Sequence, residues 1–190
     1  MTYKKIPYQY AAQVLDRFPA SDEATSLISQ EMRIDEAIST MQDGHYYNDL
    51  IQFFAHALPV RESIWWAIGC LSSRADVWSS QQKQCIENAH QWVLQPSEES
   101  RRKSELFAQR LNLNCGPSWL SQAVFWNGSG SIVAPDLPVV LPDPFLYAKA
   151  VAGAINHAAV LPAWSETDTY YEHAITTALN IANGGNGKET

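Results

Sequence analysis

The histidines and carboxylates of this sequence are the first residues whose types and spacing could support chemistry. His45 and Asp49 lie four residues apart in a predicted helix, with His56 farther along, and this spacing could supply two metal ligands. The sequence has no HExxH motif, no second histidine close by and no conspicuous carboxylate cluster. We therefore expect no metal site and no cofactor. His157 and His173 are interpreted as histidines at the core edge or on the surface.

The three cysteines, Cys70, Cys85 and Cys115, are the second set of candidates. They form no CxxC motif, and Cys70 lies within an apolar run. A thiol beside one of the five histidines could act as a nucleophile, but no local signature marks such a pair. The sequence therefore predicts buried, inert, reduced thiols and a cytoplasmic location.

The loop at residues 127–131, Asn-Gly-Ser-Gly-Ser, is a third candidate because successive backbone N–H groups can form an anion-binding nest. It lacks the lysine of a P-loop and follows a predicted helix, whereas nucleotide fingerprints follow a strand. We expect a flexible turn that leads into the proline-rich segment.

The stretch HALPVRESIWWAIGCL, residues 56–71, contains two adjacent tryptophans one turn into a helix that begins at Pro59. Trp65 is predicted to face inward with Ile64, Ile68 and Leu71, while Trp66 lies about 100° around the helix. Such a wide apolar arc predicts a central helix with neighbours on two sides; the alternative is that Trp66 is an exposed aromatic anchor. Arg61 is expected to stack on Trp65 or to pair with a carboxylate of a neighbouring helix.

Helical periodicity dominates the elements that must position these residues. It predicts helices over about 7–18, 21–28, 34–43, 45–58, 59–74, 79–95, 98–111, 116–126, 145–160 and 166–182. The helix at 98–111 is expected to bury Leu106, Phe107, Arg110 and Leu111. We predict one all-α domain over residues 1–182, an irregular orthogonal bundle or a short stack of helical pairs, with about nine or ten helices.

Residues 127–144, NGSGSIVAPDLPVVLPDP, interrupt this pattern with four prolines. Prolines at this density forbid a helix and favour an extended chain. Because the segment is also too apolar for a free linker, we expect an ordered strap that lies across the helices. The tail at residues 183–190, NGGNGKET, is predicted to be disordered.

Net charge restricts the classes of partner. The chain carries a formal charge of −7 and has a pI of about 5.1, which argues against binding to a nucleic-acid backbone. Its one compact basic cluster, residues 101–103, is interpreted as a solvated helix face with pairs Glu98–Arg102 and Glu99–Lys103. No signal peptide or membrane insertion is expected, since no apolar run approaches the length of a membrane span.

Three segments together resemble a family of bacterial proteins of about this length: HALPVRESIWWAIGC, QWVLQPSEESRRKSE and FWNGSGSIVAPDLPVVLPDPFLYAKAVAGAI. The resemblance covers about residues 45–160. Genes of this family are met near type VI secretion clusters, so the resemblance implies a cytoplasmic accessory or adaptor role. It implies no catalytic residue.

We therefore predict a non-enzymatic module that binds another protein, such as an adaptor, a chaperone-like factor or a secretion accessory. The predicted interaction surface comprises Arg61, Glu62, Trp66, Trp126, Pro138 and Pro142. Two alternatives remain: an enzyme with a site assembled from His56, Arg61, Glu62 and the loop at 127–131, and an immunity-type protein that binds a basic toxin. The oligomeric state is left open.

Overall fold

The computed structural model describes residues 3–188 of the protein. Within this range the regular structure consists of α-helices, two short 3-10 helices and an isolated β-bridge between Tyr10 and Arg33. The predicted all-α fold class is confirmed. The helices are α1 (Ala12–Leu15), α2 (Asp22–Leu27), α3 (Ile34–Asp43), α4 (Tyr47–Ala57), α5 (Val60–Ser72), η1 (Ala75–Val77), α6 (Ser80–Leu94), α7 (Glu98–Arg110), α8 (Gly116–Phe125), α9 (Leu146–Ala159), η2 (Trp164–Glu166) and α10 (Thr167–Ala182).

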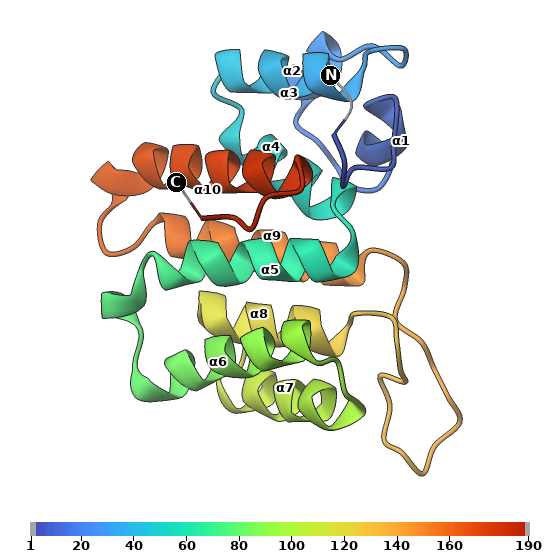
Figure 1. Ribbon diagram of the computed structural model, residues 1–190, viewed down its shortest axis with the longest axis vertical. Helices are drawn as coiled ribbons and strands as arrows, with labels where there is room; N and C mark the ends of the chain where they lie inside the picture. The colour runs from blue at the N-terminus through green and yellow to red at the C-terminus, as the bar shows by residue number, and fades with distance from the viewer. Residues whose placement is uncertain (1–2, 189–190) are drawn as a thin grey trace.

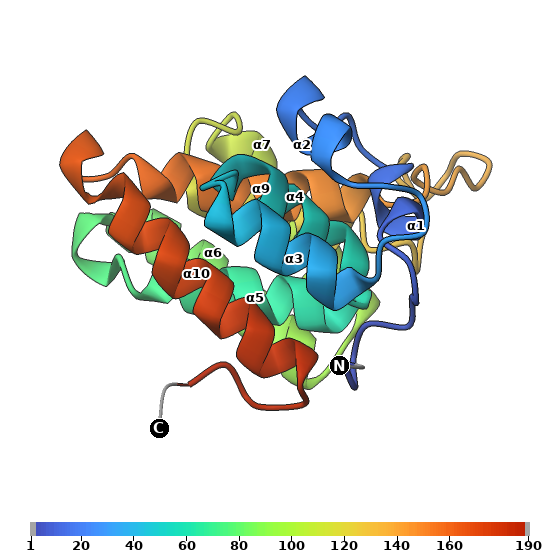
Figure 2. The same ribbon diagram turned by 90° about the horizontal axis from the view of Figure 1, so that it is seen from above.

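Helices α5 and α9 form the middle of the molecule, with α6, α7 and α8 on one side and α1 to α4 on the other (Figure 1). Helix α9 packs against α4, α5 and α8, and α5 also contacts α6, α8 and α10. Seen from above, α10 crosses α5 obliquely (Figure 2). The central position predicted for the helix at residues 59–74 is therefore observed.

Small residues allow α8 and α9 to approach closely. A Cβ atom at Gly116, the first residue of α8, would lie 2.8 Å from the carbonyl oxygen of Ala154 in α9. The buried face of α9 is largely alanine: Ala148, Ala150, Ala152, Ala154, Ala158 and Ala159. Short side chains bring the helix backbones together and build the dense interior that the fold requires.

Serine caps begin several helices where the sequence predicts. The hydroxyl of Ser21 accepts a hydrogen bond from the Ala24 N–H, and Ser79 caps α6 in the same way. Ser97 caps α7 by accepting from the Ser100 N–H. These local contacts satisfy N–H groups that have no partner within their own helix.

The first predicted helix, residues 7–18, is wrong in extent, because only Ala12–Leu15 are helical. The Ala11 N–H donates to the Met32 carbonyl, and the Ile34 N–H donates to the Gln9 carbonyl. Backbone groups that the sequence assigns to a helix therefore pair with the segment that precedes α3. This long-range pairing competes with helix formation and leaves a single turn.

Helix α7 buries a different face from the one predicted. Leu106 and Arg110 are exposed, whereas Arg101, Ser104 and Ala108 are buried. Ser104 accepts a hydrogen bond from the side-chain amide of Asn88 in α6 at 2.7 Å. The small residues at 104 and 108 allow α7 to approach its neighbours, so a stripe of low hydrophobicity becomes the inner face.

The structure favours the predicted central helix with neighbours on two sides over the alternative in which Trp66 is an exposed anchor, but Trp65, predicted to face inward, is the less buried of the two rings. Trp66 is 0% exposed, and its indole N–H donates to the Ala174 carbonyl of α10 at 2.7 Å. Trp65 is half-buried, its ring lies tilted against that of His90, and its indole N–H donates to the Asn186 carbonyl. Trp66 is therefore a core residue.

The ends of the chain and the long loop complete the fold. Residues 183–188 lie against the helices, where the Gly187 N–H donates to the Asn180 side chain; the last two residues of the predicted disordered tail lie outside the described range. The segment at 128–141 does not lie across the helices but projects from them (Figure 1). No helix in the described range combines the length and the apolarity needed to cross a membrane.

Candidate interaction site

The projecting loop, residues 127–144, is the part of the molecule that departs most from the packing of a helical bundle. Four of its large apolar side chains are exposed: Leu137 by 52%, Val139 by 75%, Val140 by 47% and Leu141 by 57%. They are consecutive but for Pro138, which is exposed as well. Single exposed apolar residues are ordinary on a protein surface, whereas a contiguous exposed group makes the loop a candidate interaction site.

The loop has a defined course. The Leu137 N–H donates to the Ala134 carbonyl and closes a turn at its tip, which contains Pro135 and Asp136. Nearer the helices, the Ile132 N–H donates to the Val140 carbonyl at 2.8 Å and ties the two limbs together. The flexible turn expected at residues 127–131 is instead a fixed entry into this loop.

A buried guanidinium holds that entry. Arg101 in α7 is 0% exposed, and it donates to the carbonyl oxygens of Phe125 and Ser131, each at 2.9 Å. Its Nε and Nη2 donate to the two carboxylate oxygens of Glu98 at 2.5 and 2.6 Å. This two-point fork requires an arginine, because the planar guanidinium presents its donors in fixed directions.

Gly130 fits against the same group. A Cβ atom at this position would lie 2.8 Å from Nη2 of Arg101 and 2.9 Å from its central carbon. The 127–131 segment thus directs the Ser131 carbonyl oxygen to a cation, whereas an anion nest would direct N–H groups to a ligand. The interpretation of residues 101–103 as a solvated face is wrong for Arg101.

Arg102 provides a second attachment. Its Nη2 donates to the Val133 carbonyl at 2.9 Å, while Nε and Nη1 donate to Glu98 and Glu105. The predicted Glu98–Arg102 pair is thus present, at 3.1 Å. The hydrogen bonds from Arg101, with a smaller contribution from Arg102, hold the pKa of the Glu98 carboxyl below its usual value.

The other residues of the predicted surface do not gather in one place. Pro138 lies in the exposed part of the loop, Pro142 is buried at its base and Trp126 is half-buried at the end of α8. Trp66 lies in the core and cannot be an interaction anchor in this structure.

Arg61 and Glu62 line a separate surface cavity of about 390 Å³. Arg61 donates to the Val93 carbonyl near the end of α6 at 2.5 Å, so it makes neither of the two predicted contacts. Glu62 pairs with Lys5 at 2.8 Å. Both side chains have structural partners.

The residues of the alternative enzyme site have separate surroundings. His56 stacks on Phe18 and its Nδ1 lies 2.7 Å from the Gln52 carbonyl, while Gly130 lies against Arg101. Burial is the main cause that lowers the pKa of His56 to about 4, and the charges of Lys149 and Arg17 lower it further. His56 is therefore a neutral core residue at neutral pH.

The thiols, and the His45 and Asp49 side chains that were considered as metal ligands, also have structural surroundings. Cys70, Cys85 and Cys115 are free and buried, and burial raises the pKa of Cys85 to about 11. His45 lies 2.8 Å from the Tyr47 hydroxyl, whereas Asp49 accepts from the N–H and hydroxyl of Ser21. Residues 3–188 contain no group of three metal-ligating side chains.

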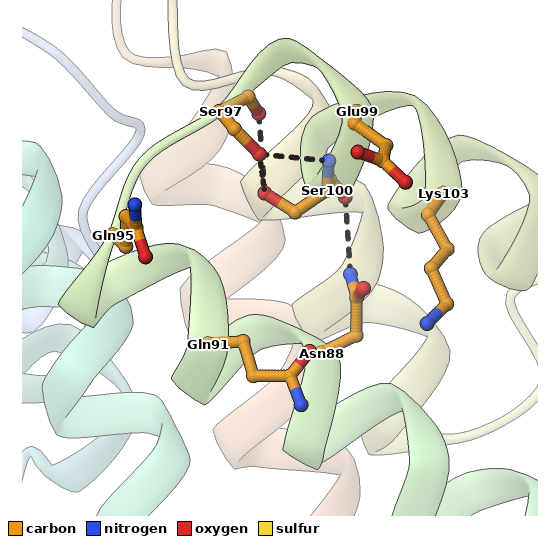
Figure 3. Close-up of a pocket in the computed structure, with 7 residues that line it drawn as sticks. All are labelled: Asn88, Gln91, Gln95, Ser97, Glu99, Ser100 and Lys103. Atoms are coloured by element: carbon orange, nitrogen blue, oxygen red, sulfur yellow. Dashed lines mark hydrogen bonds between the residues drawn. The ribbon is translucent and has the colours of Figure 1, made fainter.

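A polar hollow of about 450 Å³ lies between the end of α6 and the start of α7 (Figure 3). It is lined by Asn88, Gln91, Gln95, Ser97, Glu99, Ser100 and Lys103. The Ser100 N–H is already capped by Ser97, and the Asn88 amide donates to the Ser100 carbonyl. The hollow thus offers polar contacts but no combination of nucleophile, base and orienting group.

Sequence reasoning identified the loop but missed its arginine anchor. The one available signal is the spacing of Arg101, Ser104 and Ala108, which places a cation on a stripe of small residues. The sequence favours the more apolar face with Leu106 as the buried one, so the stripe of small residues is recognised as a helix contact only when the structure shows Leu106 exposed.

A family model described as a family of unknown function, DUF6931, matches residues 37–182. The match extends from α3 to the last residue of α10, and so includes the loop and both of its arginine anchors. Comparison with curated proteins and with solved structures gives no match. Since the matched region is most of the chain, the protein belongs to the DUF6931 family.

Proposed function

We propose that the protein is a non-enzymatic binding module whose projecting loop, residues 127–144, contacts another protein. The observation that carries this proposal is the group of exposed apolar side chains at residues 137–141. Full burial of one such side chain contributes about 1.5–3 kcal/mol, so a partner that covered several of them would be bound substantially.

The rigid base of the loop supports the proposal. Because Arg101 and Arg102 fix residues 131 and 133, less conformational entropy is lost when a partner binds. A loop whose only role was to connect α8 and α9 would need neither anchor.

The test is a comparison of partners recovered with matched variants. Full-length protein is used as bait in lysate of its source organism, beside the triple variant Leu137→Ser, Val139→Ser, Leu141→Ser. The control, Leu94→Ser with Leu106→Ser, removes exposed apolar side chains from α6 and α7. We expect at least one protein to be depleted tenfold or more with the loop variant and retained with the control. Equal recovery by all three baits would refute the proposal.

A role as a cytoplasmic adaptor, chaperone-like factor or accessory of a type VI secretion system is the finer proposal. It rests on the resemblance of residues 45–160 to a family met near such gene clusters. The test is deletion of the gene and measurement of effector secretion, with complementation by wild type and by the loop variant. We expect only the wild type to restore secretion.

A further inference from the structure

The backbone of the exposed segment has one satisfied edge and one free edge. Val140 directs both its polar groups toward the opposite limb: its carbonyl accepts from the Ile132 N–H, and its N–H donates to the Ser131 hydroxyl at 3.1 Å. In an extended chain the N–H and C=O groups of successive residues point to opposite edges. Residues 138–141 belong to no helix, and Val139 and Leu141 are exposed. An extended course of these residues would direct the groups of Val139 and Leu141 away from the opposite limb.

These outward groups are unpaired within the part of the chain that the structure describes. No hydrogen bond in residues 3–188 uses the N–H of Val139 or of Leu141. Pro138 and Pro142, which have no N–H group, bracket the free edge. The edge is therefore short, and between the two prolines its free donors are the N–H groups of Val139 and Leu141.

We propose that residues 137–141 bind a partner protein by adding as a strand to an exposed edge of the partner's β-sheet. The inference rests on the proposed function and specifies its mode. In strand addition the main-chain hydrogen bonds supply affinity, and pockets for alternate side chains supply specificity. Leu137, Val139 and Leu141 are alternate residues, so their side chains enter the partner's pockets from one face.

The partner is a different protein rather than a second copy of this chain. Residues 3–188 contain no sheet, so a second copy offers only its own loop. Two paired loops would form an isolated two-stranded ribbon, which is at best marginally stable in water. A strand that adds to the edge of an existing sheet joins a structure that is already stable.

Charge further defines the partner. Asp136 and Asp143 are the only charged residues between positions 112 and 148, and both are exposed at the ends of the apolar segment. The matching surface is an apolar groove beside a sheet edge, with basic side chains at its two ends. The same two carboxylates are repelled by an anionic membrane.

The structure protects the free edge from unspecific pairing. A long, flat and apolar edge would aggregate, but this one is limited by two prolines and flanked by two carboxylates. These are the features with which proteins limit strand pairing to a chosen partner.

The first test maps the contact directly. Full-length protein with the photo-crosslinker p-benzoylphenylalanine in place of Val139 is irradiated in cells of the source organism, and the cross-linked peptides are sequenced. We expect the cross-link in an edge strand of a β-sheet of another protein. A cross-link to a helix of another protein would overturn the strand mode but leave the proposed function intact. A cross-link to a second copy, or to no protein, would overturn both.

The second test separates the backbone from the side chain. Val139→Pro removes the outward N–H but keeps an apolar side chain, whereas Val139→Ile keeps the N–H. With the cross-linked partner purified, we expect Val139→Pro to weaken binding at least tenfold and Val139→Ile to change it less than threefold. Equal binding by both variants would overturn the strand mode. Amide exchange at Ile132 checks that the loop keeps its course in each variant.

A third measurement addresses a lipid surface. Wild type and the triple serine variant are floated with vesicles of phosphatidylethanolamine and phosphatidylglycerol. We expect neither to co-float; flotation of the wild type that the variant loses would overturn the inference in favour of membrane binding.

Discussion

The replacement Arg101→Lys tests whether one buried guanidinium fixes the projecting loop. In the wild type, separate nitrogens of Arg101 reach the Phe125 carbonyl, the Ser131 carbonyl and both oxygens of Glu98. Lysine keeps the positive charge but presents all of its donors from one nitrogen atom. It cannot maintain contacts that the guanidinium makes from three nitrogens on different sides.

The expected loss is about 3 kcal/mol in the free energy of unfolding. A hydrogen bond to a charged group contributes about 1.5–3 kcal/mol, and we count the two carbonyl contacts at the low end of that range. The Glu98 contact adds little, since that side chain is 60% exposed and exposed ion pairs contribute at most about 1 kcal/mol. For a chain of this size the loss lowers Tm by roughly 6–12 °C.

Urea unfolding followed by tryptophan fluorescence measures the loss, and amide exchange at Ile132 and Val140 reports on the loop. Arg102→Lys is the matched comparison, because Arg102 is partly exposed and makes one carbonyl contact, to Val133, so the change is expected to cost about 1.5 kcal/mol or less. We expect exchange of both loop amides to be faster in Arg101→Lys than in Arg102→Lys. Equal stability of the two variants, or unchanged exchange in Arg101→Lys, would refute the role assigned to the buried guanidinium.

Three further predictions concern a buried histidine, the two tryptophans and two glycines. Burial lowers the pKa of His56 to about 4, from about 6.5 in the unfolded chain, so the unfolded state binds more protons between these two pH values. The free energy of unfolding should therefore fall by about 3 kcal/mol from pH 6.5 to pH 4, as measured by urea unfolding against pH. This pH-dependent component should vanish in His56→Asn. Trp66→Phe loses a buried hydrogen bond and leaves a cavity, so it should cost about 2–3 kcal/mol, whereas Trp65→Phe should cost about 1 kcal/mol or less in the same assay. Gly69→Ala should stabilise α5 by about 0.5–1 kcal/mol, because the nearest atom to the added Cβ lies at 3.8 Å. Gly130→Ala should destabilise the protein by about 1–3 kcal/mol, because the added Cβ meets the fixed guanidinium of Arg101. Thermal melting distinguishes the expected rise in Tm from the expected fall.

Most of the helices could be predicted because their determinants are local. Ser79 and Ser97 cap the helices that follow them, and α5 begins at Val60, one residue after the predicted start at Pro59. The periodic apolar residues of these helices meet neighbours in the fold, so propensity, capping and burial favour the same structure. Where propensity, capping and burial agree in this way, the sequence is sufficient to predict the helix.

The remaining features depend on partners that are distant in the sequence. Periodicity placed both Trp65 and Trp66 on a wide apolar arc, but the choice between them depends on where α10 crosses α5. Arg101 is an ordinary surface residue by local criteria, and its burial depends on carbonyls 24 and 30 residues away. A pattern read within one helix contains no information on such contacts.

The projecting loop shows why apolarity alone does not predict burial. The prolines of 127–144 correctly excluded a helix, but the strap across the helices that its apolar residues predicted is not observed, because the same composition suits a segment buried by its own chain and one buried by a partner. Burial of Arg101 requires removal of its charge from water, yet the loop that it holds buries none of the four apolar side chains at 137, 139, 140 and 141. Within the isolated chain these side chains add no burial energy. Under the proposed function, they contribute that energy when a partner covers them.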